Sequence, residues 1–197
     1  MEYPGSPSRR PFRPIVKPDD AQGRLLSFKN LVELHVLAAL RRQHRIKLDS
    51  VRRAIEYLAP LSKRPLADLD LLADKSSVLV DRYGQLVSAS ESGQSVMREV
   101  MKDYLARVDR APSGQPGRFF PFVLRPELPL AEQPRFIEIN PKRAFGRPCV
   151  AGVAVPTAEI AERFVAGDAM SDIAEDFQIS LALVEEAIRF EQRTIAA

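Results

Sequence analysis

The sequence predicts a mainly α-helical protein with short β-hairpins, built from two small domains of helix-turn-helix or winged-helix type that a Pro/Gly-rich linker joins. Three observations lead to this fold class. Apolar residues recur at three- and four-residue intervals in several segments, which is the period of an amphipathic helix. Two β-rich runs are each interrupted by turn residues. A segment rich in proline and glycine, residues 109–117, breaks the helical periodicity past the middle of the chain.

The composition is that of an ordinary globular protein, since 45% of the 197 residues are hydrophobic and 28% are charged. No apolar run approaches the roughly 20 residues that a membrane-spanning helix needs, and the N-terminus lacks the apolar centre of a secretory signal. Cys149 is the single cysteine, which excludes an intrachain disulfide and a cysteine-based zinc site. We therefore expect a soluble, cytoplasmic protein with no metal and no cofactor.

The net charge of +3 is unevenly distributed along the chain. Up to Pro60 there are twelve basic and six acidic residues, so this part carries about +6 and the remainder is slightly acidic. Because local charge decides where an anionic partner binds, we expect any nucleic-acid contact at the N-terminal end.

The N-terminal domain is expected over residues 25–110, after a tail at residues 1–24 that is rich in proline and arginine. This tail is either a plain disordered end or a basic arm that contacts an anion. The first helix is predicted from Ser27 to Gln43, because the Ser27 hydroxyl can cap a first-turn amide. His35 lies in its apolar stretch without a nucleophile or ligand cluster, so we interpret it as a hydrogen-bonded core histidine.

A second helix is predicted from Leu48 to Leu58, where apolar residues are spaced three, four and three apart. A short and strongly basic connection, residues 41–47, links it to the first helix. The pair fits a helix-turn-helix element and fits equally a helical hairpin with a solvated cationic corner. On the first interpretation, the residues that contact DNA are Arg41, Arg42, Arg45, Lys47, Arg52 and Arg53.

The rest of this domain alternates between strand and helix patterns. Residues 77–87 flank a Tyr-Gly turn and predict a hairpin that is either a wing or a structural ribbon. A further amphipathic helix is predicted from Ser95 to Val108. The linker and domain boundary are placed at residues 111–130, within which Phe119 to Leu124 can form a short strand.

The C-terminal domain is expected over residues 131–197. Residues 135–139 alternate as a strand does and lead into a turn and a second strand. Three compact helices follow, from Thr157 as a plausible N-cap to about Ala166, from Ser171 to Phe177, and from Leu181 to about Arg193.

This C-terminal unit has helix-turn-helix spacing but an acidic surface. From Thr157 onward, nine acidic residues stand against three arginines, and such a surface repels phosphates. We therefore expect the unit to bind protein, either a second copy or a basic partner; the alternative is a merely solvated acidic face. The predicted partner contacts are Glu159, Glu162, Asp172, Glu175, Asp176 and Glu185.

Two parts of the chain resemble known families. The order Phe136-Ile-Glu-Ile-Asn-Pro, Gly146-Arg-Pro-Cys-Val, Ile173-Ala-Glu-Asp-Phe and Val184-Glu-Glu-Ala-Ile resembles the domain of unknown function 433. The segment Leu26-Ser-Phe-Lys-Asn-Leu-Val-Glu-Leu-His resembles the N-terminal DNA-binding region of VapB-type antitoxins that end in that domain. Those relatives carry a tryptophan-bearing helical pair ahead of this segment; this chain has no tryptophan.

The resemblance implies a MerR-like winged helix-turn-helix at the N-terminus that lacks its first helices, a homodimer, and repression of an operon. It also implies a PIN-like ribonuclease toxin as partner, which the chain would bind and neutralise as the antitoxin of a type II toxin–antitoxin system. The alternative function is a stand-alone DNA-binding transcription regulator. An enzyme has the least support, because the sequence has no glycine-rich phosphate loop and Cys149 has no histidine near it in sequence.

Overall fold

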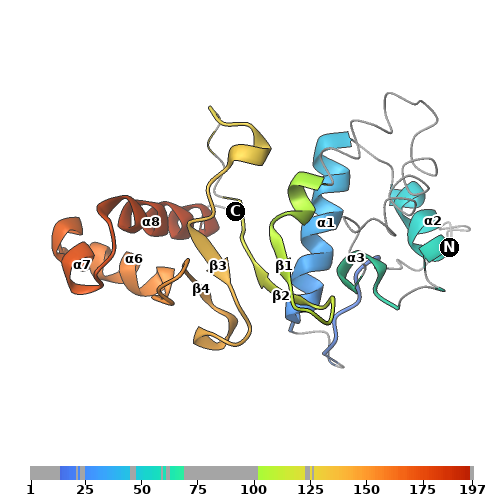
Figure 1. Ribbon diagram of the computed structural model, residues 1–197, viewed down its shortest axis with the longest axis horizontal. Helices are drawn as coiled ribbons and strands as arrows, with labels where there is room; N and C mark the ends of the chain where they lie inside the picture. Colours follow the sequence, from blue (N-terminus) through green and yellow to red (C-terminus); the bar gives the residue numbers. More distant parts are fainter. Residues whose placement is uncertain are drawn as a thin grey trace, which may run out of the picture.

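A four-stranded antiparallel sheet lies between two groups of helices in the computed structural model of the chain (Figure 1). The N-terminal group holds α1 (Phe28–His44), α2 (Leu48–Leu58) and α3 (Pro65–Asp68), and the C-terminal group holds α6 (Thr157–Val165), α7 (Met170–Asp176) and α8 (Leu181–Ile195). The structure describes residues 14–20, 22, 25–44, 48–58, 60, 63–68, 102–122, 125 and 127–195. The predicted hairpin at residues 77–87 lies outside these residues.

The sheet has the order β1-β2-β3-β4, so each strand pairs with its neighbours in the sequence. Its strands are β1 (Val108–Arg110), β2 (Pro116–Phe119), β3 (Ile137–Ile139) and β4 (Pro148–Val150). The register pairs Val108 with Phe119 and Ile137 with Val150, whereas a single pair, Phe119 with Ile139, joins β2 to β3. Two hairpins are therefore connected edge to edge, and the second leads directly into α6.

The predicted fold class, two small helix-turn-helix domains joined by a linker, is wrong. The residues expected as a linker close a hairpin instead: Ala111 and Gln115 share a backbone hydrogen bond of 2.9 Å, and Gly114 turns the chain with a φ of +78°. Proline and glycine serve here as turn residues and as the first residues of a strand, where a proline is tolerated. As a result, one sheet runs between the two helical groups.

The predicted helix from Ser95 to Val108 is also wrong at its C-terminal end. Residues 102–105 are helical, but Val108 belongs to β1 and not to the helix. Val108 continues the apolar spacing of the helix, and it is buried against β2 and α1, so its apolar character fits both structures. Tertiary packing decides between them.

The N-terminal helices pack on the sheet through a small core cluster of Val32, Ala67, Val108 and Phe119. The cap predicted for α1 is present, because the Asn30 amide donates to the Ser27 hydroxyl over 3.2 Å. The Asn30 side chain in turn donates to the Lys17 carbonyl over 2.8 Å. Residues 14–20, part of the segment expected to be a basic tail, therefore contact the start of α1.

His35 connects α1 to the first hairpin of the sheet, and its prediction as a hydrogen-bonded core residue is confirmed. Its Nε2 donates to the Tyr104 carbonyl over 3.0 Å, and its ring packs 4.6 Å from the Phe119 ring and 4.9 Å from the Tyr104 ring. Burial lowers the pKa of His35 to about 4; the hydrogen bond to the Tyr104 carbonyl opposes this only in part, and the nearby Arg107 adds a smaller lowering. The imidazole is therefore neutral at physiological pH.

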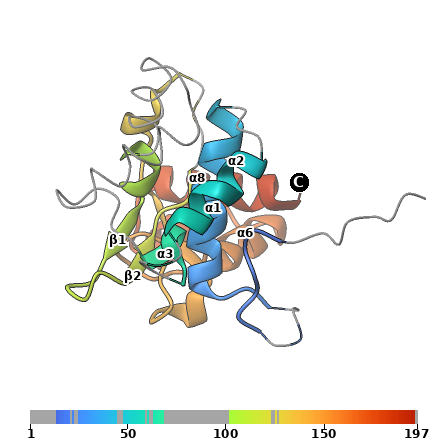
Figure 2. The same ribbon diagram turned by 90° about the vertical axis from the view of Figure 1, so that its right-hand side faces the viewer.

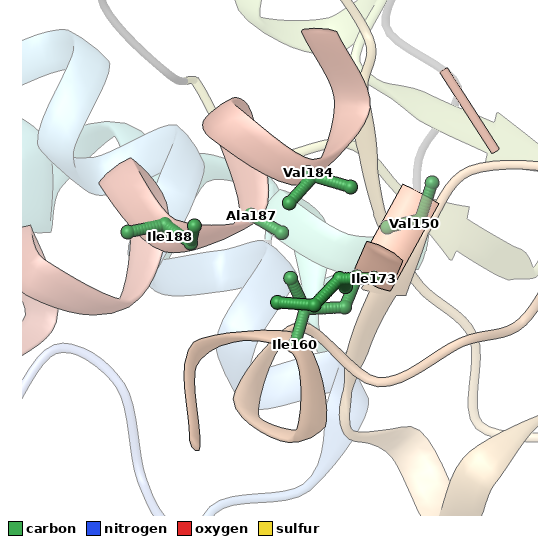
Figure 3. Close-up of a cluster of buried hydrophobic side chains, with 6 residues drawn as sticks. All are labelled: Val150, Ile160, Ile173, Val184, Ala187 and Ile188. Atoms are coloured by element: carbon green, nitrogen blue, oxygen red, sulfur yellow. The ribbon is translucent and has the colours of Figure 1, made fainter. Parts of the chain in front are cut away.

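The C-terminal helices enclose the second core cluster, which the close-up in Figure 3 shows. Ile160 of α6, Ile173 of α7 and Val184 of α8 are fully buried and meet Val150 of β4. All three helices fall within two residues of their predicted bounds. Thr157 is not the N-cap, however, because Pro156 holds that position. The one proton of the Thr157 hydroxyl is shared between two acceptors, the Glu191 carboxylate and the Pro148 carbonyl.

Candidate functional site

The outward faces of α6, α7 and α8 carry the predicted partner contacts, and all six predicted carboxylates are exposed. Two of them have polar partners. Asp176 pairs with the Arg163 guanidinium over 2.8 Å, and Asp172 accepts a hydrogen bond from the Ser171 hydroxyl over 3.1 Å. We name this surface the acidic face; its residues are Glu159, Glu162, Asp172, Glu175, Asp176 and Glu185.

Of the arginine side chains that the structure describes in the C-terminal helices, Arg163 pairs with one residue of the acidic face and Arg189 pairs with none. Arg163 is held by Asp168 over 2.6 Å as well as by Asp176, and these hydrogen bonds raise its pKa. Arg189 pairs with the buried Glu186. In the part of the chain that the structure describes, Asp176 is the one residue of the acidic face with a cationic partner, and four of its carboxylates have no hydrogen-bond or cationic partner; they are Glu159, Glu162, Glu175 and Glu185.

Two buried glutamates form ion pairs that the sequence did not single out. Glu138 of β3, 1% exposed, lies between Arg118 of β2 and Arg143, each 3.3 Å away. Glu186 of α8, also 1% exposed, pairs with Arg189 and with Arg125 from the connection between β2 and β3. Buried carboxylates keep their charge only when paired, so both glutamates fix the sheet and its connections to the helices.

The structure describes only some of the residues predicted to contact DNA. Arg41 and Arg42 belong to the last turn of α1, and their side chains, like all of Arg45 and Lys47, lie outside the described residues. Arg52 and Arg53 belong to α2, where Arg52 pairs with Asp49 over 3.0 Å one turn away.

The turn between β3 and β4, residues 140–147, is a second surface of unusual character; we name it the β3–β4 turn. Its sequence, Asn-Pro-Lys-Arg-Ala-Phe-Gly-Arg, has three basic residues and no acidic one. Ala144, Phe145 and Gly146 all have positive φ values, of 44°, 57° and 78°. Backbone hydrogen bonds of 2.9 to 3.1 Å brace them, from Gly146 to Arg143 and from Arg147 to Ala144.

Phe145 projects from this turn with 98% of its surface exposed. It also forms one wall of an open pocket of about 340 Å³ that separates the turn from the start of α1. Figures 1 and 2 place the turn and the start of α1 at the same lower end of the molecule. The other residues that line the pocket are Leu26, Ser27, Phe28, Leu31, Ile139, Pro141 and Gly146.

Cys149 of β4 is buried. Its thiol is 1% exposed and donates to the Arg147 carbonyl over 3.4 Å, and burial raises its pKa. Such a thiol is a poor nucleophile. Among the described residues, no three His, Cys, Asp or Glu side chains gather where they could hold a metal ion, and no helix has the length and apolar character to cross a membrane.

Three comparisons relate the chain to known proteins. Residues 137–190 match the family described as "Protein of unknown function (DUF433)". A Mycobacterium tuberculosis protein named "Putative antitoxin VapB45" is 24% identical over 176 residues, covering 83% of this chain and 70% of that protein. The family match and this relative together make the chain similar to antitoxin-like proteins.

The fold has a counterpart among solved structures. The crystal structure of Rv2018 from Mycobacterium tuberculosis aligns with a TM-score of 0.63 and 19% identity, over 83% of this chain and 78% of that one. At this identity the likeness concerns the fold alone. It covers most of the chain, including residues on both sides of the sheet.

Proposed function

We propose that the chain is the antitoxin of a type II toxin–antitoxin pair, which binds a PIN-like ribonuclease toxin through the acidic face and neutralises it in the cytoplasm. The observation that carries this proposal is the charge of the acidic face. Four of its carboxylates are exposed without a hydrogen-bond or cationic partner in the described part of the chain, and Arg163 is already occupied. A basic partner could therefore pair with them without breaking an existing contact.

The similarity to a protein named "Putative antitoxin VapB45" favours a toxin as that basic partner. The proposed role is binding and not catalysis, because the buried Cys149 and the neutral, buried His35 offer no reactive group at the surface. Exposed charges at the rim of an interface chiefly set the association rate and its salt dependence. We therefore expect the complex to form more slowly at high ionic strength.

The first test is co-expression with the product of the adjacent gene. A cognate toxin should arrest growth when expressed alone, and co-expression of this chain should restore growth and give a complex that co-purifies. A neighbouring product that is harmless and never co-elutes would refute the proposal.

Charge variants then test the acidic face itself. Replacing Glu162, Glu175 and Glu185 by glutamine should slow association by about tenfold at low salt, because electrostatic steering contributes 10-fold or more to such rates. The matched control replaces three exposed carboxylates elsewhere, Glu56, Glu127 and Glu132, which also lack an ion pair in the described part of the chain. Equal effects of both triple variants would show that net charge acts and not this face.

We further propose that the chain acts as a homodimer and represses its own operon through the basic residues of α1, of α2 and of the connection between them. Replacing Arg41, Arg42, Arg45 and Lys47 together by glutamine should weaken promoter binding and flatten its salt dependence. Unchanged affinity would remove these residues from the interface. A stand-alone regulator would show the same promoter binding but no co-purifying toxin, so the two experiments separate the two functions.

A further inference from the structure

We propose that the β3–β4 turn is a nucleic-acid contact, in which an unpaired base stacks on Phe145 while Lys142, Arg143 and Arg147 hold the neighbouring phosphates. This site is separate from the basic residues of α1 and α2, and the inference does not depend on toxin binding. It combines three observations: the exposure of Phe145, the backbone that presents it, and the charge around it.

The exposure of Phe145 serves no purpose inside the fold. With 98% of its surface open to solvent, the ring gains almost nothing from burial in this chain. Isolated exposed apolar residues are common, but Phe145 also has a φ of 57°, which a non-glycine residue adopts at a cost of about 1–2 kcal/mol. Ala144 before it is likewise in the left-handed region. The turn therefore has a strained backbone that presents an aromatic ring to solvent, and strain of this kind is common at functional sites.

The charge around the ring selects an anionic partner. Lys142 and Arg143 precede Phe145 and Arg147 follows it, with no acidic residue between them. Lys142 and Arg147 are exposed and have no carboxylate partner among the described residues, whereas Arg143 is anchored by Glu138 at 3.3 Å and is still half-exposed. Glu138 is buried beneath the turn, so it steadies Arg143 without showing its own charge to solvent.

A nucleic-acid strand matches this arrangement better than an acidic protein segment does. Each base of a strand has a phosphate on either side, and the turn has cations on both sides of its one exposed ring. Aromatic side chains next to cationic residues are the usual means of binding single strands, at about 1–3 kcal/mol per stacked base. The mainly apolar pocket beside Phe145, about 340 Å³ and bounded by Leu26 and Phe28, offers space for the edge of such a base.

The test measures binding of fluorescein-labelled 20-nucleotide single strands, of DNA and of RNA with one mixed sequence, by fluorescence anisotropy. Phe145→Ala should weaken binding about tenfold, the factor expected for loss of one stacked base. Phe145→Leu should weaken it similarly, and Phe145→Trp should retain it, because stacking requires an aromatic ring. The double variant Lys142→Gln/Arg147→Gln should lower the slope of log K against log salt by about 1.4.

Two control variants match these changes at other exposed positions. Val165→Ala removes an 84% exposed apolar side chain from α6. Lys102→Gln removes an exposed cation from the short helical segment at residues 102–105, which lies above β1 and away from the turn (Figure 2). Both should bind the strands as the natural chain does. The labelled duplex of the same sequence should bind more weakly, because its bases are already stacked.

Several results would overturn the proposal. These are no measurable binding of any single strand, equal binding by the natural chain and Phe145→Ala, or retained binding by Phe145→Leu. Circular dichroism of each variant separates loss of the contact from loss of folding. If the turn variants lost co-purification with the toxin and still bound the strands, the turn would be a protein contact instead.

Discussion

The buried imidazole of His35 should make the stability of the protein fall steeply below neutral pH. In the folded chain the pKa of His35 is about 4, against 6.5 for an unperturbed histidine, because burial disfavours the charged ring. As the pH falls from 6.5, the unfolded chain binds a proton that the folded chain does not. The stabilising effect of the neutral ring is therefore complete above pH 6.5 and is lost progressively down to about pH 4.

The size of the effect follows from the same two values. At 1.36 kcal/mol per pH unit, the difference between 6.5 and about 4 corresponds to about 3 kcal/mol. This is a large part of the 5–15 kcal/mol that typically separates folded from unfolded states. His35→Phe keeps an aromatic ring beside Tyr104 and Phe119 but cannot titrate, and it loses the hydrogen bond to the Tyr104 carbonyl at every pH.

The assay is urea unfolding at several pH values between 4 and 8, followed by far-UV circular dichroism because the chain has no tryptophan. The carboxylates titrate in both proteins, so the quantity of interest is the free energy of unfolding of the natural chain minus that of His35→Phe. This difference should drop by about 3 kcal/mol from pH 7 to pH 4. A difference that stays constant with pH would refute the reasoning. So would a loss of the pH-dependent drop in His44→Gln, a variant at the only other histidine of the sequence, because the drop would then belong to His44.

Three further predictions concern stability and reactivity. Ile160→Ala should lower the free energy of unfolding in urea by about 2–5 kcal/mol, since this fully buried side chain fills the C-terminal core. The control Val165→Ala, at a side chain that is 84% exposed, should change it by less than about 0.5 kcal/mol. Equal losses in both variants would contradict the packing. Phe145→Gly should stabilise the fold by about 0.5–1 kcal/mol. Glycine adopts the φ of 57° without strain, but the greater chain entropy of glycine in the unfolded state offsets part of this gain. A loss of stability would mean that Phe145 makes packing contacts in the folded chain. The Cys149 thiol should react with Ellman's reagent only after unfolding, and rapid labelling of the native protein would contradict its burial.

The sequence predicted elements well where a single amphipathic stripe decides the structure. The three-four-three spacing from Leu48 to Leu58 gave α2 with both of its ends, and the three C-terminal helices were found to within two residues. In each case the apolar residues face one core, and no other period fits them. Local propensity and burial agree in these segments.

The strand–turn–strand of β3 and β4 was predicted from the alternation at residues 135–139, but the four-stranded sheet was not, because its strands are short and the pairing between its two hairpins is non-local. β1 and β4 have three residues each, too few to show an alternation of period two, and Val108 continues the apolar spacing of a helix. Pro116 and Gly117 open β2 but read locally as linker residues. The pairing of Phe119 with Ile139 crosses twenty positions, which no local pattern records.

The sequence also shows which charged residues the candidate sites contain, but not which of those charges are accessible to a partner. Counting residues from Thr157 onward gives nine acids, but the structure removes several of them from the surface available to a partner. Glu186 is buried between Arg125 and Arg189, and Asp168 and Asp176 share Arg163.

What remains for a basic partner is a smaller set of carboxylates spread over three helices, so the electrostatic attraction is local rather than a property of the whole unit. In the same way, Glu138 lies in β3, two residues before the basic β3–β4 turn. It is buried between Arg118 and Arg143, and it does not cancel the turn's positive charge at the surface. Opposite charges can therefore act on two different partners within one short stretch of chain, because burial decides which of them a partner meets.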